Sequence, residues 1–190
     1  MKTKLLFIVL FFTSFYFFSC SVKFSDNSFT DKRDGQIYST VKIGNLIWML
    51  DNLNYDNSDS YCFDDKSTNC SIYGRLYTWE SALKACPSGW RLPTKNELMD
   101  LVEYFGGENS AADILTKTSP QGFNANYPGS RYFNGEYAGL NEYIVLWSST
   151  EIDNEKGYCF SLDREGTERI TYPDYLKTAG FSVRCVRKAY

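Results

Sequence analysis

The first patterned part of the chain alternates apolar and polar residues from Ile37 to Ile43. Gly44-Asn45 follows as a two-residue turn signal, and a second apolar run covers Leu46 to Leu50. Strands that flank such a short, glycine-containing turn pair with each other, so the pattern predicts an N-terminal β-hairpin. Periodicity is then lost from Asp51 to Asn69, where Asp, Asn and Ser dominate, and this predicts a surface loop.

Two segments with helical spacing come next, and a proline corner separates them. Thr78 is a candidate N-cap for the first helix. Its apolar positions are Trp79, Ala82, Leu83 and Cys86. Pro87 has no amide hydrogen with which to continue a helix, and Gly89 permits the reversal that follows. The first helix should therefore end at Cys86.

The second helix begins with the spacing of a capping box. Thr94 and Glu97 are placed so that each side chain can bond the other residue's backbone amide. The helix should run from about Lys95 to Phe105 and stop at Gly106-Gly107. Its apolar face consists of Leu98, Leu101, Val102 and Phe105. A short third helix near Ala111 to Leu115 is a further candidate.

The C-terminal half favours loops and strands. Residues Ser119 to Asn141 are rich in glycine, asparagine and aromatic residues, which predicts long loops with brief strands. Three strand candidates follow, at Tyr143 to Ser148, Gly157 to Leu162 and Phe181 to Val186. The whole pattern predicts an α+β fold, in which one small, twisted antiparallel sheet carries two main helices and long irregular loops.

The N-terminus has the pattern of a bacterial lipoprotein signal. Lys2 and Lys4 precede an apolar run, and Ser19-Cys20 supplies a small residue followed by a cysteine. We expect residues 1–19 to be removed, Cys20 to carry palmitate and other acyl chains, and residues 20–28 to form a tether. The domain itself would then occupy residues 29–190. Ordinary signal cleavage and a retained anchor are the alternatives.

Charge and composition exclude several classes of function. The chain has a net charge of −3, and removal of residues 1–19 takes away two lysines and no acid, which leaves −5. No basic stripe compensates, so we expect no nucleic-acid partner. The chain contains no histidine. This removes Ser-His-Asp and Cys-His catalysis, as well as the commonest zinc ligand.

Two groups of oxygen-bearing side chains are candidates for a metal site or a catalytic site. Asp and Asn residues gather in one loop and could hold calcium, although the simpler interpretation is a hydrated acidic loop. These residues are Asn54, Asp56, Asn57, Asp59, Asp64 and Asp65. A second set of carboxylates lies in the C-terminal half and could supply a glycosidase-like pair, although solvated side chains are the simpler interpretation. This set is Glu136, Glu142, Glu151, Asp153, Asp163 and Glu165. We expect neither a cofactor nor a dedicated metal site.

Aromatic residues are the leading candidates for ligand binding, because they make up 17% of the chain and include fifteen tyrosines. A tyrosine presents a flat apolar face and a hydroxyl group at little entropic cost. The candidate contact residues are Tyr127, Tyr132, Phe133, Tyr137, Tyr143, Tyr172 and Tyr175. The four tryptophans, Trp48, Trp79, Trp90 and Trp147, are expected in the core.

Five cysteines follow Cys20, so at least one of them is unpaired in an oxidising compartment. Cys62 and Cys70 are eight residues apart within the polar loop, and a local disulfide is the economical pairing. Cys159 lies in an alternating, strand-like run. We expect a buried and inert thiol there, with a reactive thiol as the alternative.

Ordered motifs along the chain resemble one known family. They are Phe29-Thr30-Asp31, Asp34-Gly35-Gln36-Ile37-Tyr38, Val41-Lys42-Ile43-Gly44-Asn45, Trp48-Met49, Asn52-Leu53-Asn54-Tyr55, Tyr73-Gly74-Arg75-Leu76-Tyr77-Thr78-Trp79, the proline corner from Ala85 to Leu98, Trp147-Ser148-Ser149-Thr150-Glu151 and Gly180-Phe181-Ser182-Val183-Arg184-Cys185-Val186. They resemble the Fibrobacter succinogenes major paralogous domain, a family of secreted and lipid-anchored bacterial proteins. The resemblance spans roughly residues 29 to 188.

The resemblance implies a compact domain similar to C-type lectins and formylglycine-generating enzymes. It also implies a disulfide between a helix cysteine, here Cys86, and a cysteine of the last strand, here Cys185. It implies no established activity. The catalytic cysteines of the formylglycine-generating relatives raise the question of Cys159, but this residue has no second cysteine near it in sequence. An oxidase is therefore not expected.

Together these observations predict a lipid-anchored protein of the outer membrane or cell surface. It would bind a glycan or a protein partner through its C-terminal loops and would not be an enzyme. The first alternative is a structural or assembly role, such as an adhesin or a fimbria-like component. A further alternative is a calcium- or carboxylate-dependent hydrolase.

Overall fold

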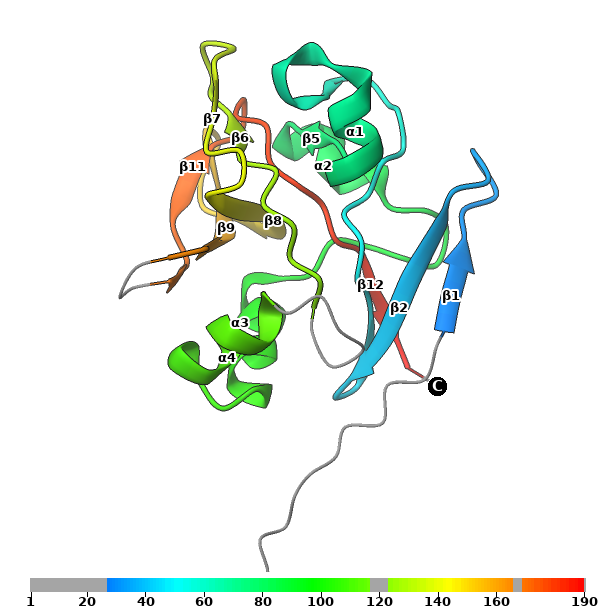
Figure 1. The fold of residues 1–190 in the computed structure, drawn as a ribbon, viewed down its shortest axis with the longest axis vertical. Helices are drawn as coiled ribbons and strands as arrows, with labels where there is room; N and C mark the ends of the chain where they lie inside the picture. Colours follow the sequence, from blue (N-terminus) through cyan, green and yellow to red (C-terminus); the bar gives the residue numbers. More distant parts are fainter. Residues whose placement is uncertain (1–26, 117–122, 166–168, 190) are drawn as a thin grey trace, which may run out of the picture.

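The structure, a computed structural model, describes residues 27–116, 123–165 and 169–189 (Figure 1). These residues form a mixed α/β fold with short antiparallel sheets and four α-helices. In chain order the elements are β1 (Asn27–Thr30), β2 (Ile37–Ile43), β3 (Leu46–Met49), β4 (Ser60–Tyr61), the 3-10 helix η1 (Phe63–Asp65), α1 (Ser67–Tyr73), β5 (Leu76–Tyr77), α2 (Trp79–Ala85), α3 (Lys95–Tyr104), α4 (Glu108–Leu115), β6 (Ser130–Arg131), β7 (Tyr137–Ala138), β8 (Tyr143–Glu151), β9 (Lys156–Asp163), β10 (Ile170–Thr171), β11 (Asp174–Leu176) and β12 (Val186–Lys188).

The first sheet joins both ends of the described chain. Its strand order is β1-β2-β3-β12, and every neighbouring pair is antiparallel. The predicted hairpin is present as β2 and β3, with Gly44-Asn45 in the turn. β12 pairs with β3, which places Val186 opposite Trp48. β1 begins at Asn27, so strand structure starts two residues inside the segment expected to be a tether.

The second sheet is built around β9. β8 pairs with one edge of β9, and β10 and β11 pair with the other edge. β8 is buried on both faces, because Ile144 and Leu146 belong to one apolar cluster while Val145 and Trp147 belong to another. Successive side chains of a strand point to opposite faces, so this strand separates the two clusters. The expectation of one small sheet is therefore wrong, since a strand that is apolar on both faces must be covered on both sides.

The C-terminal segment runs between the two sheets, as the red part of the ribbon in Figure 1 shows. Phe181 forms a bridge with Tyr77, Ser182 with Leu146, and Val186 with Arg91. Only Val186–Lys188 forms a regular strand, so the expected strand at Phe181 to Val186 lies further along the chain. The earlier residues pair singly with several elements because they cross from one sheet to the other.

The helix predictions around the proline corner are largely confirmed. The Glu97 amide donates to Thr94 Oγ1 at 3.2 Å, and the Thr94 amide donates to Glu97 Oε2 at 2.9 Å, which completes the capping box. Thr78 lies at the N-cap of α2 but makes no side-chain capping bond. Leu83 is 40% exposed, so it is not part of the apolar face assigned to it. The short helix expected near Ala111 to Leu115 is α4, which begins earlier than expected, at Glu108.

The polar loop expected from Asp51 to Asn69 contains more structure than its composition suggests. It includes β4, η1 and the start of α1, so the expectation of two main helices is wrong. α1 is short and buries only Cys70, which leaves no apolar period to detect. The Cys62–Cys70 disulfide, with Cα atoms 4.9 Å apart, holds α1 against η1 instead.

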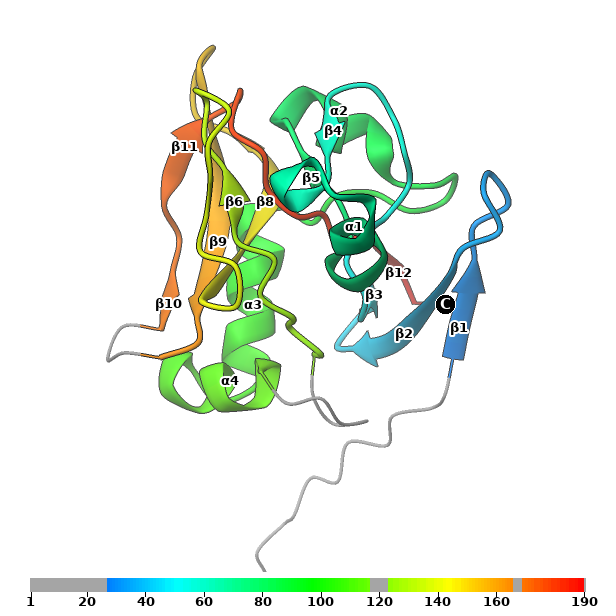
Figure 2. The same cartoon turned by 45° about the horizontal axis from the view of Figure 1, so that its top comes forward.

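Two apolar clusters share the core, and all four tryptophans lie in them, as expected. α3 and α4 cover the first cluster on one side of the β8–β9 sheet (Figure 2). Cys86 follows α2 and is bonded to Cys185, with Cα atoms 5.9 Å apart. This bond joins segments 99 residues apart at the edge of the second cluster.

A buried arginine ties the C-terminal segment to the middle of the chain. Arg184 is 1% exposed, and its Nε donates to Asn52 Oδ1 at 2.7 Å. Its terminal nitrogens donate to the carbonyl oxygens of Phe123 and Asn124. Burial lowers the pKa of Arg184 to about 9, while Asp51 acts in the opposite direction. The guanidinium is therefore charged at neutral pH and is held mainly by neutral oxygens.

No helix within the described ranges is long and apolar enough to cross a bilayer. The expected signal segment and Cys20 lie outside those ranges, as do residues 117–122 of the expected glycine-rich loop region.

Candidate functional site at the β6–β7 hairpin

Of the seven candidate aromatic residues, two pack into the core. Tyr127 and Tyr172 are partly buried against the first apolar cluster, and the Tyr172 ring lies 5.9 Å from the ring of Phe160. They are therefore placed with the core rather than on an exposed contact surface. The other five belong to the β6–β7 hairpin and to the strands next to it, β8 and β11.

One face of the hairpin meets the disulfide-closed segment around η1. The ring of Tyr137 lies 5.2 Å from the ring of Phe63, and the Tyr137 hydroxyl donates to Asp65 Oδ1 at 2.6 Å. Figures 1 and 2 show the hairpin beside this segment. Two stretches that are about 70 residues apart thus form one surface. Tyr137 is mainly a packing residue of this contact.

Arg131 lies on the same face, because it is paired directly with Tyr137 across the hairpin. Its guanidinium carbon is 4.0 Å from the ring centroid of Tyr61 and 5.9 Å from that of Tyr137. A cation over an aromatic face is stabilised by the ring quadrupole. Arg131 forms no ion pair with the described residues, and its Nε is buried without a partner. Its guanidinium acts on the Tyr137 hydroxyl, where it opposes the rise in pKa that burial causes.

The hairpin tip exposes two aromatic side chains. Phe133 is 66% exposed and Tyr132 is 39% exposed. The turn is closed by two backbone bonds, from the Tyr132 amide to the Glu136 carbonyl at 2.7 Å and from the Gly135 amide to the Tyr132 carbonyl at 2.9 Å. We name Tyr61, Arg131, Tyr132, Phe133 and Tyr137 together the hairpin surface, beneath which Phe63 is buried. Arg131 and Tyr137 lie on one face of the hairpin, and Tyr132, the next residue, points to the other face.

Glycines allow the hairpin to lie flat on its neighbours. Gly139 has φ +76°, and a Cβ atom there would lie 2.0 Å from the ring of Tyr143. Gly129 has φ +67°, and a Cβ atom there would lie 2.2 Å from the carbonyl oxygen of Ala138. Both positions therefore need glycine for space as well as for conformation.

The remaining two aromatic candidates support the hairpin from behind. Tyr143 shares a hydrogen bond of 2.8 Å with Ser130 and donates to the Ala138 carbonyl at 3.2 Å. Tyr175 is 39% exposed, and its ring lies 5.0 Å from the ring of Phe181. Tyr143 thus fixes the hairpin to β8, while Tyr175 keeps part of its surface available.

Burial of the tyrosines leads to a prediction about alkaline pH. Burial raises the pKa of Tyr38, Tyr137 and Tyr143 to about 12. Because the folded state favours the protonated hydroxyl, this stabilisation is complete below the unfolded pKa of about 10 and is lost as the pH rises toward 12. We expect tyrosinate absorbance to show a late group that ionises as the protein unfolds. Ionisation of all tyrosines near pH 10 in a protein that stays folded would contradict this.

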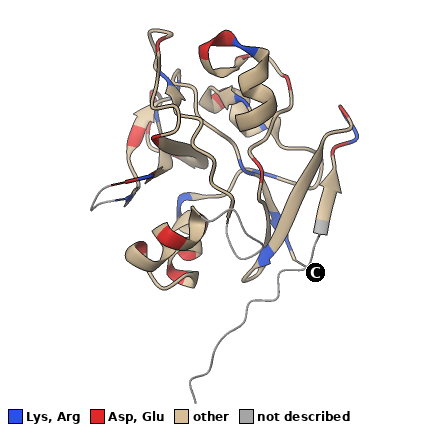
Figure 3. Ribbon diagram, in the orientation of Figure 1, with Lys and Arg blue, Asp and Glu red and all other residues tan. Residues whose placement is uncertain are grey.

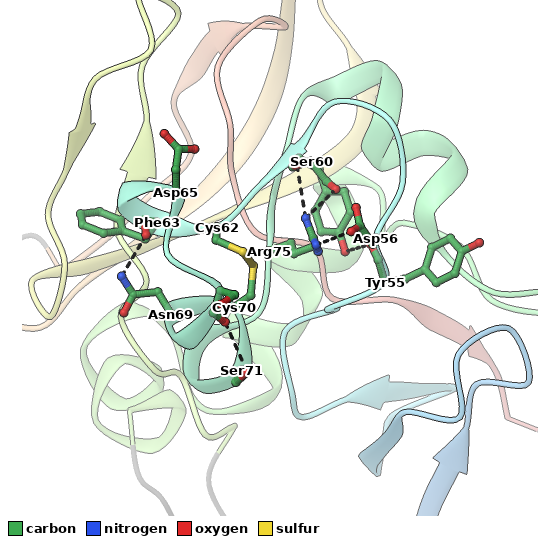
Figure 4. The surroundings of a disulfide bond; sticks show 12 residues. Tyr55, Asp56, Ser60, Cys62, Phe63, Asp65, Asn69, Cys70, Ser71 and Arg75 are labelled. Carbon is green, nitrogen blue, oxygen red and sulfur yellow. Dashed lines mark hydrogen bonds and ion pairs between the residues drawn. A yellow bond between two sulfur atoms is a disulfide. The ribbon is translucent and has the colours of Figure 1, made fainter.

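The acidic loop does not gather its carboxylates around a common point. Arg75 binds Asp56, Lys66 binds Asp64, and Tyr137 binds Asp65. Asp56 and Asp65 lie on either side of the Cys62–Cys70 disulfide in Figure 4. Among the described residues, no group of three or more Asp, Glu or Cys side chains is placed to hold a metal ion. Figure 3 shows acidic residues, in red, at the turn that leads into α1.

The second carboxylate set is partly brought together. Glu142, Asp163 and Glu165 line one pocket of about 350 Å³. Tyr143 and Arg164 also line it, and burial raises the pKa of Asp163. The other three members lie elsewhere and have local partners: Glu136 accepts from Asn134, Glu151 from Lys177, and Asp153 from the Glu155 amide.

Cys159 is buried in the second apolar cluster and is the free cysteine of the described residues. Its Sγ donates to the Pro173 carbonyl at 3.3 Å, and burial raises the pKa of the thiol. Thiolate formation is therefore disfavoured, which is consistent with an inert residue.

The sequence interpretation missed Tyr61, Phe63 and Arg131. Asn134-Gly135 was an available signal for a hairpin, because Asn-Gly pairs mark two-residue turns. Such a turn would pair Arg131 with Ala138, whereas the observed turn has three residues and places Arg131 opposite Tyr137. No local signal links Tyr61 and Phe63 to the hairpin, because that contact is entirely tertiary.

One comparison with known proteins gives a match. The family model described as the Fibrobacter succinogenes major domain matches residues 41–187, from within β2 to within β12. It is the family that the ordered motifs resemble, so that expectation is confirmed. The search of curated proteins and the search of solved structures found no match.

Proposed function

The chain belongs to the Fibrobacter succinogenes major domain family, and from that premise we propose that it is a non-catalytic binding domain displayed outside the cell. Residues 1–19 would direct export, and lipidated Cys20 would anchor the protein to the outer membrane or cell surface. The ligand would be a glycan or a protein partner, and it would be held by the hairpin surface. Palmitate labelling that persists in a Cys20→Ala variant would refute the anchor.

The exposed hairpin tip is the observation that carries the binding proposal. Phe133 and Tyr132 are exposed at the end of a hairpin whose base is fixed by Tyr137 and Tyr143. Exposed aromatic rings on a firmly held support lose little conformational entropy when a ligand covers them. Tyr127 and Tyr172 do not offer such exposed rings to a ligand, because they pack against the core.

We also propose that the fold is of the C-type-lectin type. Two features support this proposal. Both ends of the described chain lie in one sheet, β1 at one edge and β12 at the other. A disulfide joins the end of α2 to the segment before β12. An experimental structure with a different strand order would refute it.

The assembly role is less well supported. Strand addition needs a long unpaired edge, and most outer strands of the two main sheets are short. β1 has four residues, β11 has three and β10 has two. The one long outer strand, β8, is buried from Ile144 to Ser148 and is bridged to Gly129 and Ser182.

Hydrolysis is the second candidate, because Glu142, Asp163 and Glu165 line one pocket. If the protein cleaves a sugar substrate and an Asp163→Asn variant does not, hydrolysis would replace binding as the proposed function.

A hairpin variant tests the binding proposal. We expect the mature protein to bind a glycan array or purified envelope protein, and a Tyr132→Ala, Phe133→Ala variant to lose most of that binding. Ile72→Ala with Met99→Ala is a matched control, because it also removes two exposed apolar side chains, which are 63% and 41% exposed, but lies on α1 and α3. Equal binding by the wild type and the hairpin variant would overturn the proposed site.

A further inference from the structure

Most arginines of the described chain have an anionic or carbonyl partner. The ion pairs are Arg33 with Asp31, Arg75 with Asp56, Arg91 with Glu97 and Arg169 with Asp113. Arg184 is bonded by buried oxygens, and Arg164 is exposed. Arg131 and Arg187 differ from these, because each has a buried Nε without a partner and makes no ion pair with a described residue. Both also lie over an aromatic ring, as Arg33, Arg164 and Arg184 do.

Arg131 and Arg187 differ in the surroundings of their side chains. Arg187 is in β12 and lies 5.1 Å from the ring of Trp90, which is buried in the core. Arg131 lies between Tyr61 and Tyr137, which are only partly buried, and is followed directly by the exposed Tyr132 and Phe133. Its terminal nitrogens make no hydrogen bond with a carboxylate or carbonyl oxygen of the described residues, and Nη2 lies beside Gly135 in the turn.

Nearby acids do not neutralise Arg131. Asp65 accepts the hydroxyl of Tyr137 at 2.6 Å, and Glu136 accepts from Asn134 Nδ2 at 2.8 Å. Neither forms an ion pair with Arg131. The guanidinium therefore offers a planar pair of donors, the geometry that binds a carboxylate with two hydrogen bonds.

We propose that Arg131 binds the carboxylate of an acidic sugar, a uronic acid within a glycan held by the hairpin surface. This inference rests on the proposed function, because the rings of Tyr61 and Tyr137 beside Arg131 belong to the hairpin surface. The aromatic rings beside Arg131 offer flat faces to a sugar ring, and the guanidinium recognises its charged group.

The size and charge of the site favour a glycan over a protein. A stable protein interface covers about 800 Å² on each partner. The hairpin tip exposes two aromatic side chains, which suits a few sugar rings better. A dense polyanion is disfavoured as well, because the chain has a net charge of −3 and the site has a single unpaired cation.

Paired oligosaccharides test the carboxylate directly. The probes are galacturonate, glucuronate and mannuronate tetramers, each beside its carboxyl-reduced neutral form, titrated against the full mature protein. We expect at least one acidic tetramer to bind about tenfold to a hundredfold more tightly than its reduced form, as befits a charge-assisted hydrogen-bonded pair. The difference should shrink as salt concentration rises.

Variants assign the effect to one residue. Arg131→Gln should abolish the preference for the acidic form, and Arg187→Gln, the matched control, should retain it. Circular dichroism and the melting midpoint of both variants show whether they are folded. If Arg131→Gln does not fold, Arg131→Lys serves in its place, and it should weaken the preference because an ammonium lacks the planar donor pair.

The outcomes separate this inference from the proposed function. Equal binding of acidic and reduced tetramers, or no binding of any acidic tetramer, overturns the carboxylate assignment and leaves the hairpin site standing if the Tyr132→Ala, Phe133→Ala variant still loses glycan binding. A preference that survives in Arg131→Gln overturns the role of Arg131. Binding that survives the loss of Tyr132 and Phe133 overturns the hairpin site itself.

Discussion

Removing the Cys86–Cys185 disulfide by a Cys86→Ala, Cys185→Ala double substitution is expected to destabilise the protein by about 4 to 5 kcal/mol, less any strain released. The bond closes a loop of 99 residues, and an open unfolded chain of that length has many more conformations. Denaturant unfolding of the wild type and the variant measures the effect.

The second disulfide supplies the control for this measurement. Cys62→Ala with Cys70→Ala opens a loop of only eight residues, for which the same chain-entropy relation gives about 2 to 3 kcal/mol. The long-range bond should therefore contribute about 2 kcal/mol more than the local one. Equal effects of the two double variants would mean that chain entropy does not dominate.

Replacing Arg184 by methionine is expected to cost about 3 to 5 kcal/mol, because three buried oxygen acceptors would each lose a charged donor. These acceptors are Asn52 Oδ1 and the carbonyl oxygens of Phe123 and Asn124. Methionine fills a similar volume, so the loss reports mainly the polar contacts.

Arg164→Met is the control for the Arg184 variant, because Arg164 is exposed and its side chain makes a single hydrogen bond with the described residues, a 3.5 Å bond to the Asn141 carbonyl. A change within about 0.5 kcal/mol is expected there. A similarly small loss for Arg184→Met would show that the buried charge costs about as much to desolvate as its hydrogen bonds return.

Local signals were sufficient wherever neighbours in sequence determine the structure. The Thr94–Glu97 capping box and the hairpin turn at Gly44-Asn45 depend on residues within a few positions, and both are present. The pairing of Cys86 with Cys185 came from the ordered family motifs rather than from any local pattern. α1 was missed because a disulfide, rather than an apolar face, holds it.

Tertiary placement could not be predicted in the same way. Arg184 falls within the strand expected from Phe181 to Val186, and nothing near it indicated that its partners Asn52 and Phe123 lie 132 and 61 residues away. Tyr127 and Tyr132 are both tyrosines in a glycine-rich stretch, yet one packs on the core and the other is exposed. Composition identified the candidate region, and only the packing separates contact residues from support.

The segment that runs between the two sheets follows, in the chain, the elements of both sheets against which it packs. Phe181, Val183, Cys185 and Val186 are all at most 1% exposed. Neither apolar cluster is complete without this segment, so a chain that emerges from the ribosome lacks part of its interior until residues 179–186 are available. If the protein is exported as proposed, this order delays premature folding and keeps the polypeptide in a form that can be threaded across a membrane.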